Sequence, residues 1–251
     1  MPTKVCDFCG QPTDSSVCPH CQSDFSDNFR QLPDFQYVAP KEIVYKSKYY
    51  TNWVERVEQY KEVFYSEITP ETHTFVDLGC GPNKFVELIK HDFPKIRATG
   101  YDQYALSESV ITFDFENEKL PFKQKELDII LLSHVLEHLE KIHFVIESAI
   151  YSSKTVIVVL PNCLSLYSSV RAAIKGGLGG LYGLPLTPPK DRHRWIYTSS
   201  EMDRFIGYYA FKYNLSYKVI YLLHSKSIPI VSTLIKRPFI DEAIYVLRHN
   251  E

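Results

Sequence analysis

The segment 74–83 constrains the fold of this chain more than any other part of the sequence. A short apolar run ends at Asp77, and two glycines one residue apart, Gly79 and Gly81, separate it from a second apolar run that begins at Lys84 with helical spacing. This order predicts a strand, a tight loop and a helix. Glycine in such a loop lets the backbone approach a ligand closely, because no Cβ lies in the way.

The loop must first be compared with the fingerprint that binds nicotinamide cofactors. That fingerprint has a third glycine three residues beyond the second. In this chain Lys84 occupies the position, and its side chain would obstruct the close helix–strand packing that a third glycine permits. The loop alone therefore does not show which cofactor is bound, and residues further along the chain are needed to decide.

Two further apolar runs end in an acid. The runs 97–102 and 110–115 carry Asp102 and Asp114 at or near their ends. In a doubly wound sheet the carboxyl ends of parallel strands line one crevice, so these two acids and Asp77 are predicted to lie at the same edge. Each acid taken alone can instead cap a loop or the following helix.

The run 127–139 reads as a fourth strand that continues directly into a helix, and it ends in His-Val-Leu-Glu-His-Leu. Together with the loop and the acids, it closely resembles the class I S-adenosylmethionine (SAM)-dependent methyltransferases. The resemblance extends over about residues 40–250 and is closest in 75–139. It implies an α/β fold with a doubly wound, seven-stranded Rossmann-like sheet, whose last two strands, 215–223 and 242–247, form a hairpin-like pair.

The resemblance also implies which residues contact SAM. Asp102 would accept hydrogen bonds from both ribose hydroxyls, and Asp114 would accept one from the adenine amino group. The complete expected set is Asp77, Leu78, Gly79, Cys80, Gly81, Asp102, Gln103, Asp114, Phe115 and Ser133.

Residues 1–24 are predicted to form a separate unit. Two Cys-x-x-Cys pairs, Cys6 with Cys9 and Cys18 with Cys21, lie eight residues apart. Four thiolates at this spacing indicate a structural zinc site resembling a short zinc ribbon. Because so few residues cannot bury a core, the metal would supply the folding free energy. Disulfides are the alternative, and zinc is favoured because the N-terminus lacks the apolar core of a secretory signal.

Residues 25–70 are expected to be a connector and an N-terminal helix that precede the methyltransferase domain, 71–251. The connector tyrosines Tyr45, Tyr49 and Tyr50 either contact SAM or belong to a surface linker. In the helix, apolar and aromatic residues recur at helical spacing, and we interpret this face as packing against the sheet. The face consists of Trp53, Val57, Tyr60, Phe64 and Ile68.

His134, Glu137 and His138 are expected on one face of the helix that follows the fourth strand, at positions i, i+3 and i+4. Two imidazoles and a carboxylate so arranged suggest a divalent metal. Ubiquinone-pathway O-methyltransferases and small-RNA 3′-end methyltransferases hold such a metal with Glu-x-x-Glu-His, but this chain has His134 in place of the first glutamate. Structural or substrate-facing histidines are therefore the favoured interpretation.

The region 163–197 is predicted to contain a lid and the acceptor site. Leucines and a tyrosine are interspersed with the glycines of 175–185, which suits a lid better than a solvated spacer. The segment 191–195 resembles the Asp-x-His-x-aromatic segment of methyltransferases that act on sugars and other small molecules. His193 is the first candidate for a general base, because imidazole titrates near neutral pH. His134 is the second candidate, and a structural cap is the competing role for His193.

The sequence as a whole favours a cytoplasmic SAM-dependent methyltransferase acting on a small molecule. The 251 residues carry a formal net charge of −2, and no stretch approaches the ~18 apolar residues of a membrane helix. The expected acceptor is a hydroxyl of a sugar or lipid-linked sugar. One alternative is a ribosomal or transfer RNA base, read by the zinc unit, although few basic residues in that unit and the negative charge disfavour nucleic acid. A non-catalytic SAM sensor is the third possibility.

Overall fold

The computed structural model describes residues 4–5, 12–13, 57, 60–104, 107–177, 193–223 and 240–250. The chain divides into two compact units, 1–38 and 39–251. In the first unit the described residues form an antiparallel pair of two-residue strands, β1 (Lys4–Val5) and β2 (Pro12–Thr13). The predicted zinc ligands and connector tyrosines lie outside the described residues: Cys6, Cys9, Cys18, Cys21, Tyr45, Tyr49 and Tyr50.

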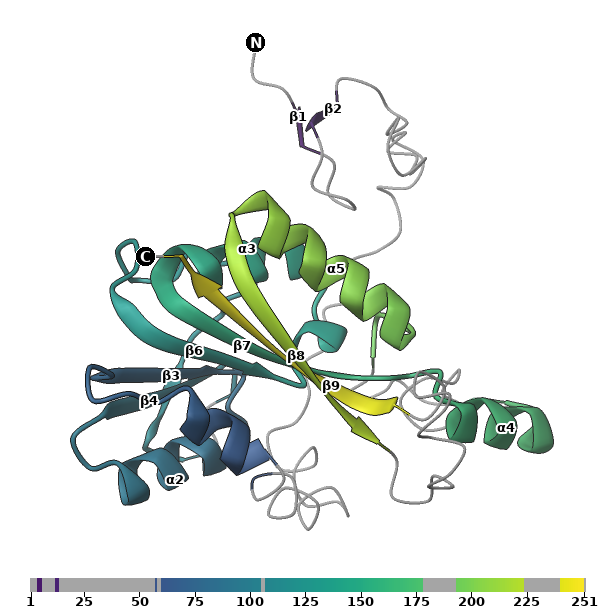
Figure 1. Cartoon of the computed structure of the whole chain (residues 1–251), viewed down its shortest axis with the longest axis horizontal. Coiled ribbons are helices and arrows are strands. Elements are labelled where there is room, and N and C mark those ends of the chain that lie inside the picture. Colours follow the sequence, from purple (N-terminus) through teal and green to yellow (C-terminus); the bar gives the residue numbers. More distant parts are fainter. Residues whose placement is uncertain are drawn as a thin grey trace. The chain divides into compact units, whose positions relative to one another are not determined.

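The second unit is built on a seven-stranded sheet with the order β5-β4-β3-β6-β7-β9-β8 (Figure 1). Strands β3 to β7 are parallel, β9 pairs antiparallel with β7, and β8 pairs antiparallel with β9. This topology confirms the predicted doubly wound sheet and its final strand pair. The strands are β3 (Thr74–Leu78), β4 (Arg97–Asp102), β5 (Val110–Thr112), β6 (Leu127–Ser133), β7 (Ser153–Pro161), β8 (Leu215–Leu223) and β9 (Ile240–His249).

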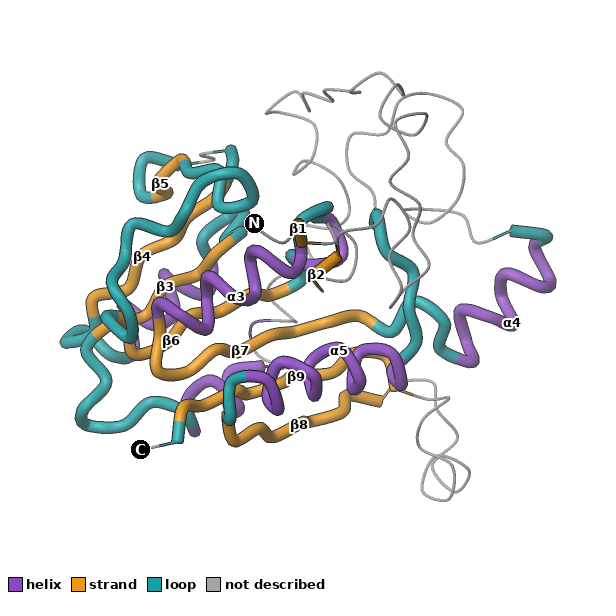
Figure 2. Tube along the Cα trace, turned by 90° about the horizontal axis from the view of Figure 1, so that it is seen from above, coloured by secondary structure: helices purple, strands orange, loops and turns teal. Residues whose placement is uncertain are grey.

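Helices cover both faces of this sheet. In the described part of this unit, the helices include α2 (Lys84–Asp92), α3 (Ile142–Ser152), α4 (Leu166–Lys175), α5 (Ser199–Lys212) and the short 3-10 helix η2 (Leu136–His138). Helices α3 and α5 lie on one face and α2 on the other (Figures 1 and 2). Ile146 and Ile206 belong to one buried cluster, and Ile89 belongs to a second with Tyr60 and Phe64 of the helical segment 60–66. The packing role predicted for that segment is therefore confirmed for its described residues.

The middle of each central strand is apolar, as expected where both faces of the sheet are covered. In β6, the residues from Ile129 to Leu132 are at most 2% exposed, as expected for a parallel strand between two helical layers. The polar residues that bear on function lie at the carboxyl ends of the strands or beyond them. At this edge Asp77 of β3 pairs in register with Gly100 of β4 and Leu131 of β6.

The structure differs from the sequence prediction just after β6. His134 adopts a left-handed backbone conformation with φ of 54°, and the chain then forms the three-residue helix η2 before α3 begins. The prediction that β6 continues directly into an α-helix, with His134, Glu137 and His138 on one helical face, is therefore wrong. Similarly, β5 ends at Thr112, so Asp114 lies two residues beyond its strand.

Helix α5 begins with the capping box predicted from the sequence. The Thr198 hydroxyl oxygen accepts from the Glu201 backbone N–H, while a carboxylate oxygen of Glu201 accepts from the Thr198 N–H at 2.8 Å. These hydrogen bonds help to satisfy two amides at the helix end, where the Glu201 N–H also donates to the Thr198 carbonyl at 3.0 Å.

Replacing Thr198 with Ala should lower the free energy of unfolding by about 1 kcal/mol, because the Glu201 amide and carboxylate both lose their hydrogen bond to the Thr198 hydroxyl. The Thr198 amide and hydroxyl also lower the pKa of Glu201, so the contribution of the Glu201 carboxylate is present at neutral pH and lost as the pH falls through that lowered pKa. Urea denaturation of the full chain at two pH values measures both effects, and Thr198→Ser, which keeps the hydroxyl, serves as the matched control.

Candidate active site

The loop after β3 has the conformation that its glycines predict. Gly79 and Gly81 have φ values of 77° and 48°, which residues with a Cβ rarely adopt. A Cβ on Gly79 would also lie 2.5 Å from Cγ2 of Val135. The backbone amides of Gly79 and Cys80 both donate to the carbonyl of Tyr101 in β4, at 2.7 and 3.1 Å. The tight turn therefore depends on glycine for both its backbone conformation and its packing.

Asp102 holds this loop against the end of β4. One carboxylate oxygen accepts from the Gly81 N–H at 2.9 Å, and the other accepts from the Tyr104 N–H at 2.9 Å. Burial raises the pKa of Asp102, although these backbone hydrogen bonds oppose the increase. A carboxylate has about four lone-pair sites, so both oxygens can still accept from a ligand. The next residue, Gln103, is exposed at the same edge.

Asp77 is a buried acid without a hydrogen-bond partner. It is 1% exposed, and neither carboxylate oxygen has a partner in the described part of the chain. Burial, followed by the charge of Asp102, raises the pKa of Asp77 well above its usual range. Leaving a buried carboxylate unpaired is unfavourable, whereas a cationic ligand would supply both charge and donors. This arrangement fits the ammonium group of SAM.

The remaining residues of the expected cofactor set fall into two groups. Leu78, Cys80, Phe115 and Ser133 are buried near the ends of the strands, and the Ser133 hydroxyl has no partner among the described residues. Asp114 instead accepts hydrogen bonds from the backbone N–H groups of Glu116 and Asn117, and so caps a turn. The structure therefore shows Asp114 in the turn-capping role that was the alternative. A contact between Asp114 and adenine remains a prediction.

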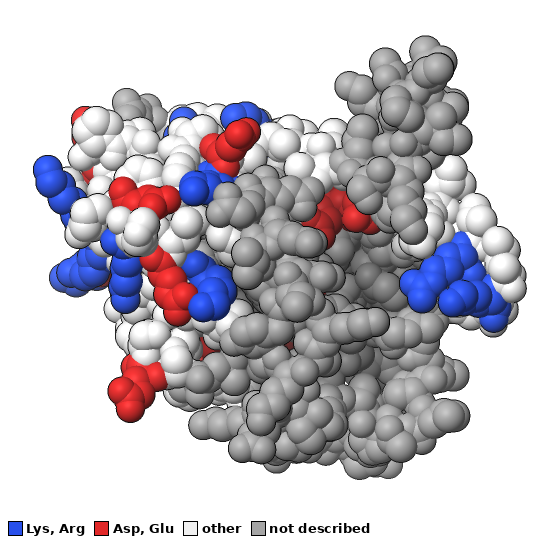
Figure 3. Space-filling model, turned by 90° about the horizontal axis from the view of Figure 1, so that it is seen from below, with Lys and Arg blue, Asp and Glu red and all other residues white. Residues whose placement is uncertain are grey.

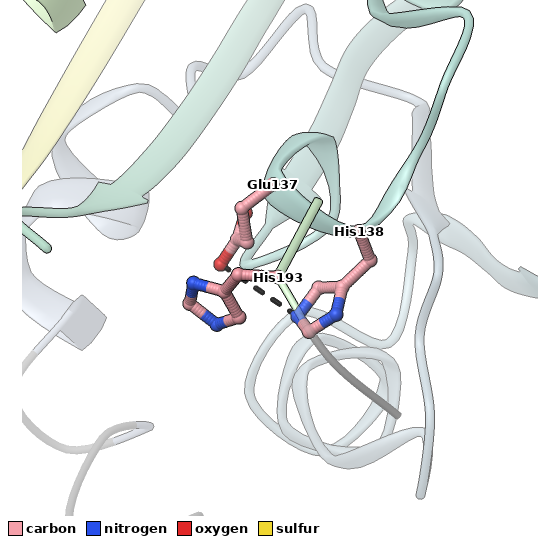
Figure 4. A group of neighbouring side chains, drawn as sticks. All are labelled: Glu137, His138 and His193. Carbon is pink, nitrogen blue, oxygen red and sulfur yellow. Dashed lines mark ion pairs between the residues drawn. The ribbon is translucent and has the colours of Figure 1, made fainter. Parts of the chain in front are cut away.

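A second polar cluster lies at the same edge of the sheet. Glu137 and His138 belong to η2, and His193 lies just before α5. One potential ligand atom from each side chain lies within 4.8 Å of the other two, and the three side chains converge in Figure 4. The rings of His138 and His193 meet edge to face, with centroids 4.7 Å apart. The sequence did not group these three residues together, because His193 is 55 residues or more from the other two.

Glu137 is the charged centre of this cluster. It is fully buried, and its two carboxylate oxygens lack hydrogen bonds to any described residue. One of these oxygens lies 3.4 Å from Nδ1 of His134 and 3.9 Å from Nε2 of His138, which are ion-pair distances. Burial acts to raise the pKa of Glu137, but His134 foremost, then His138 and His193, outweigh it and lower the pKa. The carboxylate is therefore ionised at neutral pH.

The cluster has the donor set of a divalent-metal site. Two imidazoles and a carboxylate match the preferences of Zn²⁺, Fe²⁺ and Mn²⁺, and the unpartnered carboxylate of Glu137 fits a bound cation. His134 was expected to join Glu137 and His138, but it is not one of the three residues of this cluster. Its Nε2 lies 3.0 Å from the Tyr60 hydroxyl and 3.4 Å from a carboxylate oxygen of Glu242.

Three residues that sequence reasoning missed complete the edge. Tyr60 is fully buried, and its hydroxyl donates to Glu242 as well as contacting His134. A hydroxyl on an otherwise apolar helical face indicates a buried partner, but nothing in the sequence identifies that partner as Glu242. Cys163 lies after β7, and its sulfur is 3.8 Å from Nδ1 of His193.

The fold and the first of these two sites define a class of protein. A parallel sheet with a reversed final strand pair, a Gly-x-Gly loop and two buried acids beside it describe a class I SAM-dependent methyltransferase. A family model described as a methyltransferase domain matches residues 48–204, which is more than half of the chain. The chain belongs to this methyltransferase family, and it is a SAM-dependent methyltransferase.

Solved structures share this fold at low sequence identity. A SAM-dependent methyltransferase from Archaeoglobus fulgidus has a TM-score of 0.54 and 18% identity, with 79% of this chain and 94% of that one covered. The plantazolicin methyltransferase BpumL, in complex with SAH, has a TM-score of 0.52 and 16% identity, with coverages of 80% and 89%. The small RNA methyltransferase HEN1 has a TM-score of 0.56 and 16% identity, with coverages of 79% and 26%.

No curated protein matches the chain. Within the described ranges, the structure contains no helix that is both long and apolar enough to span a bilayer.

Replacing Asp77 with Asn should weaken SAM binding by roughly 10- to 100-fold, the value of a charge-assisted hydrogen bond. In the parent, SAM affinity should fall as the pH decreases through the raised pKa of Asp77, because protonation removes the negative charge that binds the ammonium group. Calorimetric titration of SAM at several pH values tests both expectations. The Asn variant should lose this pH dependence, and unchanged affinity would exclude the assigned role.

Asp102 and Asp114 can be separated in the same assay. Asp102→Ala should weaken SAM binding by at least about tenfold, because the charged acceptor is lost together with the contact that holds Gly81. Asp114→Ala should weaken SAM binding only if this carboxylate also contacts adenine. A loss of thermal stability with unchanged SAM affinity would assign Asp114 the turn-capping role alone.

Proposed function

We propose that this enzyme transfers the methyl group of SAM to a hydroxyl of a small-molecule acceptor, a sugar or a lipid-linked sugar. The observation that carries the proposal is the cluster of buried Glu137, half-buried His138 and buried His193 at the sheet edge that also bears the SAM loop. A sulfonium-bound methyl group needs little activation, so the protein has to align an acceptor oxygen and assist the loss of its proton.

Glu137, His138 and His193 are the residues that would hold a divalent cation. When bound, such a cation lowers the pKa of a coordinated hydroxyl. The chain itself supplies a fully buried, ionised carboxylate flanked by two imidazoles. His134 acts as a positioning residue, because its Nδ1 faces Glu137 while Tyr60 and Glu242 hold its other nitrogen.

The second candidate acceptor is RNA. Its support is the structural similarity of this chain to the small RNA methyltransferase HEN1. The formal net charge of −2 counts against it, because nucleic-acid-binding proteins usually present a basic surface.

Glu137→Gln should lower methyl transfer by roughly 100-fold or more while leaving the affinity for SAM within about twofold of the parent. The assay follows labelled methyl from SAM into separated small-molecule, glycolipid, RNA and protein fractions of an extract supplied with the full chain. Glu140→Gln is the matched control, because Glu140 is 67% exposed and pairs with Arg194 at the surface, where an ion pair contributes little.

Mn²⁺ titration followed by electron paramagnetic resonance provides a readout independent of activity, because a nitrogen and oxygen site suits Mn²⁺ better than four thiolates do. The parent should bind Mn²⁺ at a site that Glu137→Gln and His193→Ala lose. If a metal chelator leaves the rate of methyl transfer unchanged but His193→Ala abolishes transfer, His193 acts as a general base without a metal. Labelled methyl in the RNA fraction would show that the acceptor is RNA and would contradict the proposed small-molecule acceptor.

A further inference from the structure

Helix α4 stands away from the sheet and from the other described helices (Figures 1 and 2). It begins at Ser165, whose hydroxyl accepts from the Ser168 N–H, and ends at Gly176 in a left-handed conformation with φ of 70°. No residue within α4 is buried. A ten-residue helix is marginal in water by itself, so an exposed helix of this length gains stability when its apolar face is covered.

The apolar residues of α4 lie on one face. Leu166, Val170 and Ile174 are spaced four residues apart, and they are 43%, 47% and 80% exposed. Tyr167, at 45% exposure, lies beside Ile174 when residues are placed 100° apart around the helix axis. The side chains form a continuous apolar strip, which we call the α4 apolar face.

Positive charge flanks this face. Arg171 and Lys175 follow Tyr167 around the helix, and neither forms an ion pair or a side-chain hydrogen bond with another described residue. Lys and Arg side chains gather at the α4 end of the molecule in Figure 3. The thirty residues 161–190 contain three basic residues and no Asp or Glu, in a chain whose net charge is −2.

We propose that the α4 apolar face docks the enzyme on an anionic lipid surface. An interfacial helix places its apolar side chains at the boundary between headgroups and acyl chains, while lysine and arginine pair with anionic headgroups. The argument for lipid, rather than for a protein partner or a second copy, is charge complementarity: the only charged residues of α4 are the cations Arg171 and Lys175, which lie beside the strip. The helix is too short to span a bilayer, so it lies on the surface.

The position of α4 connects this surface to the acceptor site. Only two residues lie between Leu166 and Cys163, whose sulfur lies 3.8 Å from Nδ1 of His193. A docked α4 therefore holds the carboxyl edge of the sheet close to the lipid surface. This favours the lipid-linked member of the proposed acceptor class. The inference about a lipid-linked acceptor rests on the proposed function, whereas the docking of α4 on lipid does not.

Sedimentation of the full-length protein with vesicles tests the docking. Phosphatidylcholine vesicles with phosphatidylglycerol should bind the parent, and vesicles of phosphatidylcholine alone should bind it far less. The double variant Val170→Ser/Ile174→Ser should bind the anionic vesicles at least about tenfold more weakly, because each buried aliphatic side chain contributes strongly to partitioning. Ile111→Ser is the matched control, since Ile111 is 46% exposed on β5.

A second pair of variants tests the charges. Arg171→Glu/Lys175→Glu should weaken binding to the anionic vesicles by at least about tenfold, since each basic residue near the surface is worth roughly a factor of five. Lys90→Glu/Lys95→Glu makes the same change in net charge at exposed positions in and after α2. Binding that falls equally in both charge variants would attribute it to net charge and overturn the role of α4.

Three further results would overturn the proposal: no sedimentation of the parent, unchanged binding of the Val170→Ser/Ile174→Ser variant, or a parent dimer that this variant dissociates. The last result would identify the α4 apolar face as an interface between copies. SAM binding and Mn²⁺ binding should be the same in all α4 variants. A failure of vesicle binding is therefore distinguishable from a failure of the proposed chemistry.

Discussion

The hydrogen bond from the Gly81 N–H to the Asp102 carboxylate is the interaction on which the rest of the site depends. It joins the loop after β3 to the end of β4, and Gly81 makes it from a left-handed conformation. With the loop held in this way, the Asp77 side chain is enclosed without a partner of its own. The protein therefore keeps an unpaired, buried carboxyl group in place whose ionised form burial disfavours, and a cationic ligand would meet a preorganised acceptor there.

Much of the fold could be predicted because its signals are local. Apolar runs, the acids at the ends of β3 and β4, the Thr198 capping box and the paired final strands each depend on a short stretch of sequence, and the structure confirms them. The turn at His134 could not be predicted in this way. The sequence His-Val-Leu-Glu-His suits a helix, but His134 donates its backbone N–H to the carbonyl of Val159 in the neighbouring strand β7, and this tertiary contact accompanies the left-handed conformation of His134.

The candidate acceptor site was predicted only in part for a related reason. Its residues converge through contacts between distant segments. The Arg194 backbone N–H donates to the Glu137 carbonyl at 2.8 Å, and the Trp195 indole N–H donates to the Leu139 carbonyl at 2.6 Å. These bonds fix His193 beside η2. Glu242 reaches His134 only because β9 runs antiparallel to β7, and no local pattern in the sequence encodes that proximity.

The anchoring of His193 has a consequence for how such an enzyme can diversify. The hydrogen bonds that hold His193 in place come from Arg194 and Trp195, and they are made to Glu137 and Leu139, so they involve no residue of the segment between Gly177 and His193. Because the entropic cost of closing a loop grows only slowly with its length, insertions, deletions and substitutions in this segment need not displace the histidine. Selection can thus reshape what the enzyme accepts while its reactive centre stays in place.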